Sequence, residues 1–162
     1  MSDTPIDSAE FRRVLGHYPT GVTLVTGVDA AGPVGMVVGS FGSVSLDPPL
    51  VMFMPTTTST TWQRIEPTRR FCVNVLCDDQ VEMCNAFFSK VDHVWDDVAW
   101  HPAPSGSPII DSALAWVDCE VDSVLEAGDH VIVLGRVVAL GADDTDRTPI
   151  VFFKGGYGRY AS

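Results

Sequence analysis

Apolar and polar residues follow one another in short runs along most of this chain, a pattern that predicts strands more often than helices. The expected strands lie at about 22–28, 34–39, 50–55, 70–76, 113–126, 130–140 and 149–154. Two turn sequences predict hairpins, Asp29-Ala-Ala-Gly32 after the first strand and Glu126-Ala-Gly-Asp129 between the two longest strands. The segment 89–111 is rich in Pro, Asp and Gly, so we expect a loop there.

Three segments have the signals of short helices. Asp7 and Glu10 have capping-box spacing, so a first helix is expected from there to Gly16. A second is expected near 60–65, and a third after Asp78 as its cap. The predicted apolar faces are Phe11, Val14 and Leu15 in the first helix and Val81, Cys84 and Phe88 in the third. Strands outnumber helices and no linker interrupts the chain. We therefore expect a single domain over residues 1–162, mainly β with short helices, folded as a closed antiparallel Greek-key-like β-barrel.

Composition and charge narrow the class of protein. Of the 162 residues 46% are hydrophobic and 19% are charged, which argues against disorder. The net charge of −11 predicts neither nucleic acid nor an anionic membrane as a partner. The first twenty residues have no apolar signal core, and no run has membrane-spanning length, so we expect a cytoplasmic protein.

The sequence contains no pattern typical of a disulfide framework, a metal site or a Rossmann dinucleotide site. Cys72, Cys77, Cys84 and Cys119 form no Cys-x-x-Cys pair and have no histidine at metal-ligand spacing. We expect four free thiols and no metal site. The run 155–158, Gly-Gly-Tyr-Gly, has the wrong spacing for a dinucleotide fingerprint, so a nicotinamide cofactor would not bind in the Rossmann manner.

The stretch 33–61 carries the strongest hint of a ligand. Gly39 and Gly42 leave backbone free of side chains, Ser40, Ser43 and Ser45 add small polar groups, and 56–61 adds a tract of hydroxyls. This combination suits a flat aromatic ligand that carries a phosphate. An ordinary Gly/Ser hairpin beside a Thr-capped helix explains the same residues, and the pattern alone favours it.

An ordered set of short segments adds to that hint. They are Phe-Arg-Arg-Val-Leu-Gly at 11–16, Thr-Gly-Val-Thr at 20–23, Ser-Val-Ser-Leu-Asp-Pro-Pro-Leu at 43–50, Phe-Cys-Val-Asn-Val-Leu at 71–76, Gly-Ser-Pro at 106–108, Ala-Gly-Asp-His at 127–130 and Gly-Gly-Tyr-Gly at 155–158. Together, over about 150 residues, they resemble the flavin reductase-like domain family. The resemblance implies an FMN-binding split barrel that forms a homodimer, with flavin near the subunit interface.

The resemblance also implies roles for individual residues. The flavin ring is expected along Val37, Val38, Gly39 and Ser40, with Ser45 as a further small polar group. The phosphate and ribityl chain are expected at Pro55, Thr56, Ser59, Thr60 and Thr61. Lys90, His93, Lys154, Tyr157 and Arg159 are expected on the nucleotide side. Arg64, one turn into the second helix, either adds charge there or is solvated.

His130 is the expected catalytic residue, beside the nicotinamide and flavin rings. The alternative is a turn histidine that pairs with Asp129. Three positions depart from the family's pattern: Gly39 where many relatives carry Asn or Ser, Ala86 where many carry a basic residue, and His93 where Lys or Arg is common. The last two departures remove positive charge, for which Lys90 can compensate.

The expected activity is that of an NAD(P)H:flavin oxidoreductase. It would reduce FMN or FAD by hydride transfer from NADH or NADPH and supply diffusible reduced flavin to a separate monooxygenase. Such a reaction needs orientation of two cofactors but no protein nucleophile. Two alternatives stay open, a split-barrel flavoprotein that retains its flavin and acts on another substrate, and a non-catalytic flavin-binding carrier or sensor.

Overall fold

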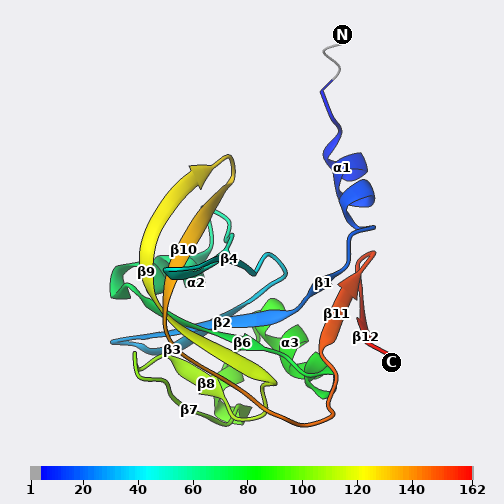
Figure 1. The fold of residues 1–162 in the computed structure, drawn as a ribbon. Coiled ribbons are helices and arrows are strands. Elements are labelled where there is room, and N and C mark those ends of the chain that lie inside the picture. Colours follow the sequence, from blue (N-terminus) through cyan, green and yellow to red (C-terminus); the bar gives the residue numbers. More distant parts are fainter. Residues whose placement is uncertain (1–4, 162) are drawn as a thin grey trace.

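The computed structural model describes residues 5–161, and its centre is a seven-stranded antiparallel sheet (Figure 1). In spatial order the strands are β3 (Gly32–Val38), β2 (Thr23–Asp29), β6 (Arg70–Val75), β9 (Ala115–Ala127), β10 (His130–Ala142), β5 (Pro49–Phe53) and β4 (Gly42–Leu46). The two predicted hairpins are confirmed, since β2 pairs with β3 across 29–32 and β9 pairs with β10 across 127–130. The prediction of a mainly β chain with short helices is also confirmed.

The predicted closed barrel is wrong, because the sheet is open at β3 and β4. No hydrogen-bonded ladder joins these two edge strands within residues 5–161. Only Gly39 to Phe41 link them, and the Ser40 hydroxyl accepts a hydrogen bond from the backbone N–H of Met54 at 2.9 Å. This hydrogen bond ties the link between the two edge strands to the chain just after β5.

The remaining strands are short and belong to two small sheets. One contains β1 (Thr20–Gly21), β11 (Ile150–Phe153) and β12 (Gly156–Arg159), and the other pairs β7 (Trp100–Pro102) with β8 (Pro108–Ile110). The sequence missed β1, β4, β7, β8 and β12, because strands of two to five residues are too short for an alternating pattern to stand out. The expected loop at 89–111 thus contains a small hairpin.

The three predicted helices are present as α1 (Ser8–Leu15), α2 (Thr60–Ile65) and α3 (Val81–Phe88). Short 3₁₀ turns lie at Glu66–Thr68, Asp78–Gln80 and Val94–Asp97. Asp7 caps α1 by accepting from the N–H of Glu10, as expected. None of the helices in this part of the chain is long and apolar enough to cross a membrane.

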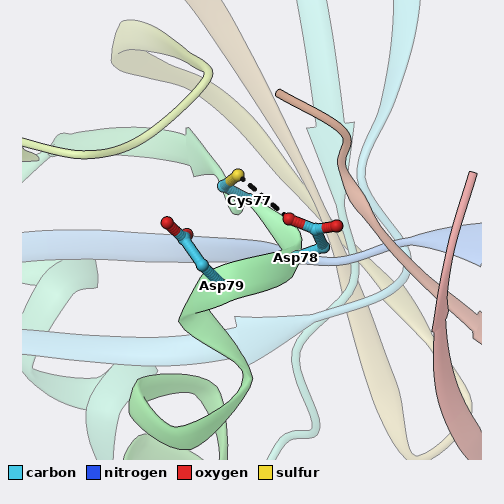
Figure 2. A group of neighbouring side chains, drawn as sticks. All are labelled: Cys77, Asp78 and Asp79. Carbon is cyan, nitrogen blue, oxygen red and sulfur yellow. Dashed lines mark hydrogen bonds between the residues drawn. The ribbon is translucent and has the colours of Figure 1, made fainter. Parts of the chain in front are cut away.

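The start of the third helix differs from the prediction. The turn Asp78–Gln80 precedes α3, with Cys77 rather than Asp78 at its cap position (Figure 2). The side-chain oxygen of Gln80 accepts from the N–H of Cys77 at 2.8 Å. The predicted inward positions of Cys84 and Val81 are confirmed, but the third inward residue is Phe87, whereas Phe88 is 74% exposed.

Two of the three clusters of buried residues form most of the core. The larger lies between the sheet and α2, where Phe53 packs edge-to-face against Trp62 and Phe71. The smaller joins Leu24 and Leu76 of the sheet region to Phe87 of α3 and Ile150 of β11. It is this second cluster that fixes the end of α3 beside β3.

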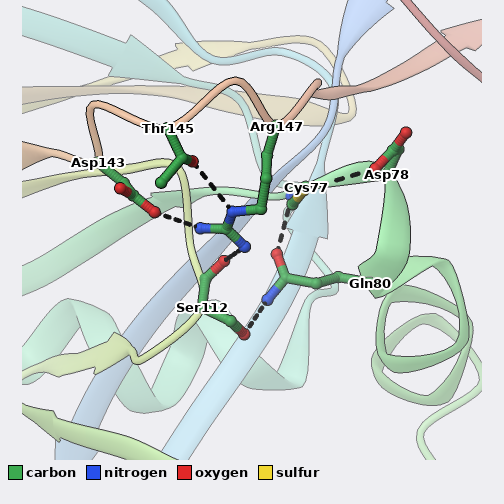
Figure 3. Close-up of polar contacts among 7 residues, drawn as sticks. All are labelled: Cys77, Asp78, Gln80, Ser112, Asp143, Thr145 and Arg147. Carbon is green, nitrogen blue, oxygen red and sulfur yellow. Dashed lines mark hydrogen bonds and ion pairs between the residues drawn. The ribbon is translucent and has the colours of Figure 1, made fainter.

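A polar network fixes the segment that connects β10 to β11 (Figure 3). Arg147 donates to the carboxylate of Asp143 at 2.6 Å and to the carbonyl of Ser112 at 2.9 Å. Gln80 donates to the hydroxyl of Ser112 at 2.7 Å while it accepts from Cys77. The connection is therefore tied to the start of α3, and the hairpin of β11 and β12 begins from a fixed point.

Helix α2 is tied to the turn between β2 and β3 by an ion pair. The Arg64 guanidinium donates to both carboxylate oxygens of Asp29, at 2.6 and 2.7 Å, and to the carbonyl of Gly32 at 3.2 Å. These bonds lower the pKa of Asp29 to about 2, chiefly through the hydrogen bond from Arg64. Arg64 is therefore engaged by the turn at Asp29 while its side chain stays 38% exposed, and it does not line the cavity described below.

We expect Asp29→Asn to lower the melting temperature at pH 7, by a few degrees for a domain of this size. The amide keeps an acceptor for the N–H of Ala31 and loses only the charge. Since the folded-state pKa lies below that of an unfolded Asp, about 3.9, the stabilisation is present above pH 4 and is lost as the pH falls towards 2. Thermal unfolding from pH 7 to pH 2.5 should show the two melting curves converge below pH 4. Asp97→Asn, at an exposed position, is the control, and a constant difference at all pH values would contradict the argument.

Candidate functional site

A cavity of about 510 Å³ opens beside the free edge of β3. Its lining comes from residues 35–40, from the segment 54–61, from the end of α3 at 87–90 and from His130. The first segment is mainly backbone and apolar side chains, whereas the second is rich in hydroxyls. The cavity therefore has one wall suited to a flat apolar ring and another suited to a polar chain.

Two glycines keep the apolar wall flat. A Cβ at Gly35 would lie 3.0 Å from the ring of Phe87, so glycine allows α3 to approach β3. A Cβ at Gly39 would lie 3.0 Å from the hydroxyl oxygen of Thr20. That hydroxyl is the one buried side-chain oxygen or nitrogen without a partner in residues 5–161. Thr20 thus occupies the room that a side chain at position 39 would need.

The hydroxyl wall is shaped by the start of α2. Ser59 caps this helix by accepting from the N–H of Trp62 at 3.1 Å, so its hydroxyl is already engaged. The first N–H groups of a helix have no partner within the helix, which leaves donors at Thr60 and Thr61. Lys90 donates to the hydroxyl of Thr60 at 3.4 Å and is the only lysine or arginine among the residues that line this cavity. The polar wall is therefore suited to an anion.

Backbone pairing places His130 at the rim. Thr56 forms an antiparallel bridge with His130, Val131 donates to the carbonyl of Pro55 at 3.0 Å, and Thr57 donates to the carbonyl of Asp129 at 3.0 Å. These bonds hold the start of β10 against the segment that follows β5. The side chain of His130 is consequently fixed beside the hydroxyl wall.

His130 also pairs with its neighbour in sequence. Its Nδ1 lies 2.7 Å from the carboxylate of Asp129, and this hydrogen bond lowers the pKa of that carboxyl group. The predicted pairing of His130 with Asp129 is therefore confirmed. The same ring also lines the cavity. A proton shared between Nδ1 and Asp129 leaves Nε2 for a ligand.

Most of the predicted site residues come together in this cavity. Those that line it are Val37, Val38, Gly39, Ser40, Pro55, Thr56, Ser59, Thr61, Lys90 and His130. Those that do not line it are Ser45, Thr60, His93, Lys154, Tyr157 and Arg159. The sequence missed Gly35, Met36, Met54, Thr58, Phe87 and Phe88. Phe87 and Phe88 carried a signal, a pair of rings at the end of a helix, but the sequence placed Phe88 rather than Phe87 inward. Contact of any of these residues with a ligand stays a prediction.

Three of the predicted residues have local partners. Ser40 uses its hydroxyl to bind the N–H of Met54, so it joins the two walls. Tyr157 packs against the second core cluster, accepts from the thiol of Cys84 at 3.3 Å, and has a pKa raised to about 12, mainly by burial. His93 is exposed, and its ring lies 3.7 Å from the carboxylate of Asp96.

One group of residues has the spacing of metal ligands, at the turn before α3. The thiol of Cys77 and the carboxylates of Asp78 and Asp79 have ligand atoms within 4.8 Å of one another (Figure 2). The thiol, however, donates to Asp78 at 3.5 Å, and burial raises the pKa of Cys77. Thr148 donates to the other oxygen of Asp78. A protonated thiol is a poor metal ligand, so the absence of a metal site remains our prediction.

Comparison with known proteins places the chain among relatives of similar length. The family model described as "Flavin reductase like domain" matches residues 15–161. A flavin reductase of Pseudomonas putida is 49% identical over 97% of this chain and 92% of its own length. The reductase subunit HsaB of a flavin-dependent monooxygenase of Rhodococcus jostii is 43% identical over 94% of this chain and 77% of its own.

A solved structure agrees with these matches. The NADH:FAD oxidoreductase SgcE6 of Streptomyces globisporus C-1027, in complex with NAD and FAD fragments, superposes with a TM-score of 0.90. It is 36% identical, and the alignment covers 99% of this chain and 97% of that one. The similarity therefore extends over the whole architecture described above.

Proposed function

The chain belongs to the flavin reductase-like domain family, and we propose that it is an NAD(P)H-dependent reductase of FMN or FAD whose cavity beside β3 holds the flavin. The observation that carries this proposal is the pairing of a glycine-interrupted apolar wall with a hydroxyl wall that bears one lysine. The whole chain, residues 1–162, acts as a single flavin reductase-like domain. The open sheet edge at β3 and β4 suits a split barrel that receives the ring.

The residues of the cavity fit the parts of a flavin. Backbone at Gly39 and Ser40 can donate to the polar edge of the ring, where charge develops on reduction. Thr58, Thr61 and the free N–H groups at the start of α2 are placed for the ribityl chain and phosphate. Lys90, held near Thr60, neutralises the phosphate. Phe88, exposed at the rim, is available to stack on a ring.

The chain's own residues orient the partners rather than react with them. When bound, nicotinamide and flavin supply direct hydride transfer between their rings. His130, with Nδ1 directed at Asp129, presents Nε2 towards the cavity, where it positions the nicotinamide or donates a proton as charge develops. The walls exclude water from one face of the ring.

The product of this reaction is a reduced flavin that leaves for a separate monooxygenase. A relative is named as the reductase subunit of such an enzyme. The cavity holds its ligand with hydroxyls, backbone and one exposed lysine, a set that suits modest affinity and release. The four cysteines, all free, favour the reducing conditions of the cytoplasm.

A homodimer completes the proposal, because much apolar surface is uncovered. The exposed large apolar residues include Phe11, Val14 and Leu15 of α1, Val44 and Leu46 of β4, Val138 and Leu140 of β10, and Phe152 and Phe153 of β11. Leu46 is 95% exposed and α1 buries no residue at all, although one of its faces is apolar. Monomers rarely expose so many large apolar side chains on neighbouring elements, and a second copy would cover them.

Anaerobic turnover tests the activity. Purified protein should oxidise NADH or NADPH and accumulate reduced free FMN or FAD well beyond one equivalent per protein. A single equivalent, held on the protein, would indicate a flavoprotein that retains its flavin. Flavin binding without any oxidation of the nicotinamide would indicate a carrier or sensor, and either result would overturn the proposal.

We expect His130→Gln to lower kcat/KM for the nicotinamide at least about tenfold, since positioned acid–base groups contribute roughly a hundredfold or more. Flavin affinity should change little, because the cavity walls stay intact. His101→Gln is a matched control, since His101 also lies 2.7 Å from a neighbouring carboxylate, Asp111, but does not line the cavity. Stopped-flow kinetics and flavin titration measure both quantities. Equal losses of kcat/KM in the two variants would show that His130 is not the catalytic residue.

We expect the double variant Phe11→Glu/Leu15→Glu to shift the sedimentation coefficient from dimer to monomer. Two carboxylates on the apolar face of α1 would have to be buried unpaired in the interface, at a cost of several kcal/mol. Asn85→Glu, an exposed position on α3, adds the same kind of charge elsewhere and should leave the dimer intact. Wild-type protein that sediments as a monomer at micromolar concentration would refute the homodimer.

A further inference from the structure

A second cavity, of about 500 Å³, lies between α1 and the turn that joins β11 to β12. Figure 1 shows the tip of this hairpin directly beside the end of α1, away from the main sheet. The lining residues are Ala9, Arg12, Arg13, Gly16, His17, Lys154 and Gly155. We call this cavity the basic cleft. None of its lining residues belongs to the cavity beside β3.

The basic cleft is lined by positively charged side chains, although the net charge of the whole chain is negative. The protein has a net charge of −11, yet the cleft is lined by two arginines, a lysine and a histidine. Arg13 is engaged, since its guanidinium donates to both carboxylate oxygens of Glu10 at 2.7 Å. The side chains of Arg12 and Lys154, by contrast, form no hydrogen bond or ion pair within residues 5–161. Two cations are therefore available to a ligand.

Local backbone geometry holds Lys154 at this place. Lys154 and Gly155 both have positive φ, 49° and 79°, in the two-residue turn between β11 and β12. Lysine is an unusual residue at such a position, where Asn or Gly is preferred. The N–H of Lys154 donates to the carbonyl of Gly16 at 3.0 Å, and its ammonium lies 5.2 Å from the ring centroid of Phe153. Lys154 thus occupies a backbone conformation that is unfavourable for lysine, and its charge lies beside the end of α1.

The basic cleft is connected electrostatically to the rim of the first cavity. The pKa of Asp129 is lowered first by the hydrogen bond from His130 and, among smaller causes, by the charge of Arg12. Asp129 in turn holds His130, which lines the cavity beside β3. Backbone pairing also brings the two cavities together, because Gly39 of the first cavity lies against Thr20, and Thr20 pairs with Phe152, two residues before Lys154 of the cleft. Phosphate is the anion that Arg and Lys recognise best together.

We propose that the basic cleft binds the phosphate groups of the nicotinamide nucleotide through Arg12 and Lys154, an inference that rests on the proposed function. The nicotinamide ring meets the flavin near His130, and the charged half of the nucleotide extends to α1. Since the nucleotide has no Rossmann site in this chain, the cleft supplies the charge that the departures at Ala86 and His93 remove.

Calorimetry on flavin-free protein at low salt tests this site without any turnover. The probes are inorganic pyrophosphate, 5′-ADP and 2′,5′-ADP. The variants are Arg12→Gln, Lys154→Asn and the double variant. Asn is chosen at position 154 because it tolerates the positive φ of this turn. Arg70→Gln is the matched control, because it removes one exposed cation far from the cleft and outside both cavities.

Wild-type protein should bind the ADP probes, and the double variant should bind them at least about tenfold more weakly, as expected when two charged contacts to phosphate are lost. Arg70→Gln should stay within about twofold of wild type, since it changes only the distant field. In steady-state assays the double variant should raise KM for NADH or NADPH with little change in kcat, because the lost contacts serve binding and not chemistry.

Two results would overturn the proposal, namely no binding of either ADP probe to wild-type protein, or equal binding to the wild type and the double variant. Circular dichroism and sedimentation check that the fold and the oligomeric state are unchanged. If the double variant is disturbed, the single variant Arg12→Gln decides the question, because Arg12 is exposed on the helix surface. Protein that binds the probes but reduces no flavin would remove the proposed activity while leaving the phosphate site established.

Discussion

The site depends on a few backbone hydrogen bonds that join two distant segments of the chain. Residues 55–57 pair with 129–131 through the bridge between Thr56 and His130 and the bonds on either side of it. This pairing extends the contact of β5 with β10 beyond the regular ladder. It holds residues 55–57 along the start of β10, and the hydroxyl tract there lines the cavity beside β3. Without this pairing, the distance between the two walls of the cavity would not be fixed.

The open edge of the sheet follows from the same arrangement. β3 and β4 are the two edges of the sheet, and the three residues between them are tied to the chain after β5 by the bond from Met54 to Ser40. A closed barrel would satisfy every edge group and leave no room for a ligand beside β3. The structure instead keeps an open edge, two glycines along it, and a helix end packed behind it through Phe87. These features form a candidate binding site, and the edge strands β3 and β4 stay unpaired with each other.

The outer elements show what a single chain leaves uncovered. Helix α1 has an apolar face and a basic face but buries no residue. The apolar face suits a second copy, while the basic face and the turn at Lys154 enclose a cleft. Charge and apolar surface are thus separated on one short helix. In the proposed homodimer, subunit contact and phosphate binding would therefore use different side chains of the same helix.

The sequence by itself determined the elements that are long or have a strong local signal. The hairpin of β9 and β10, the turn at 29–32, the cap of α1 and the bounds of α2 depend on contacts within a few residues, so local patterns reveal them. Ten of the predicted site residues also line one cavity, since the motif at 33–61 is nearly continuous in the chain. Only the tertiary structure decided the rest. The 3₁₀ turn before α3 is held by Gln80, the engagement of Arg64 depends on Asp29, and the basic cleft joins residues about 140 positions apart. Such pairings are set by packing between segments, and no local pattern records which segments meet.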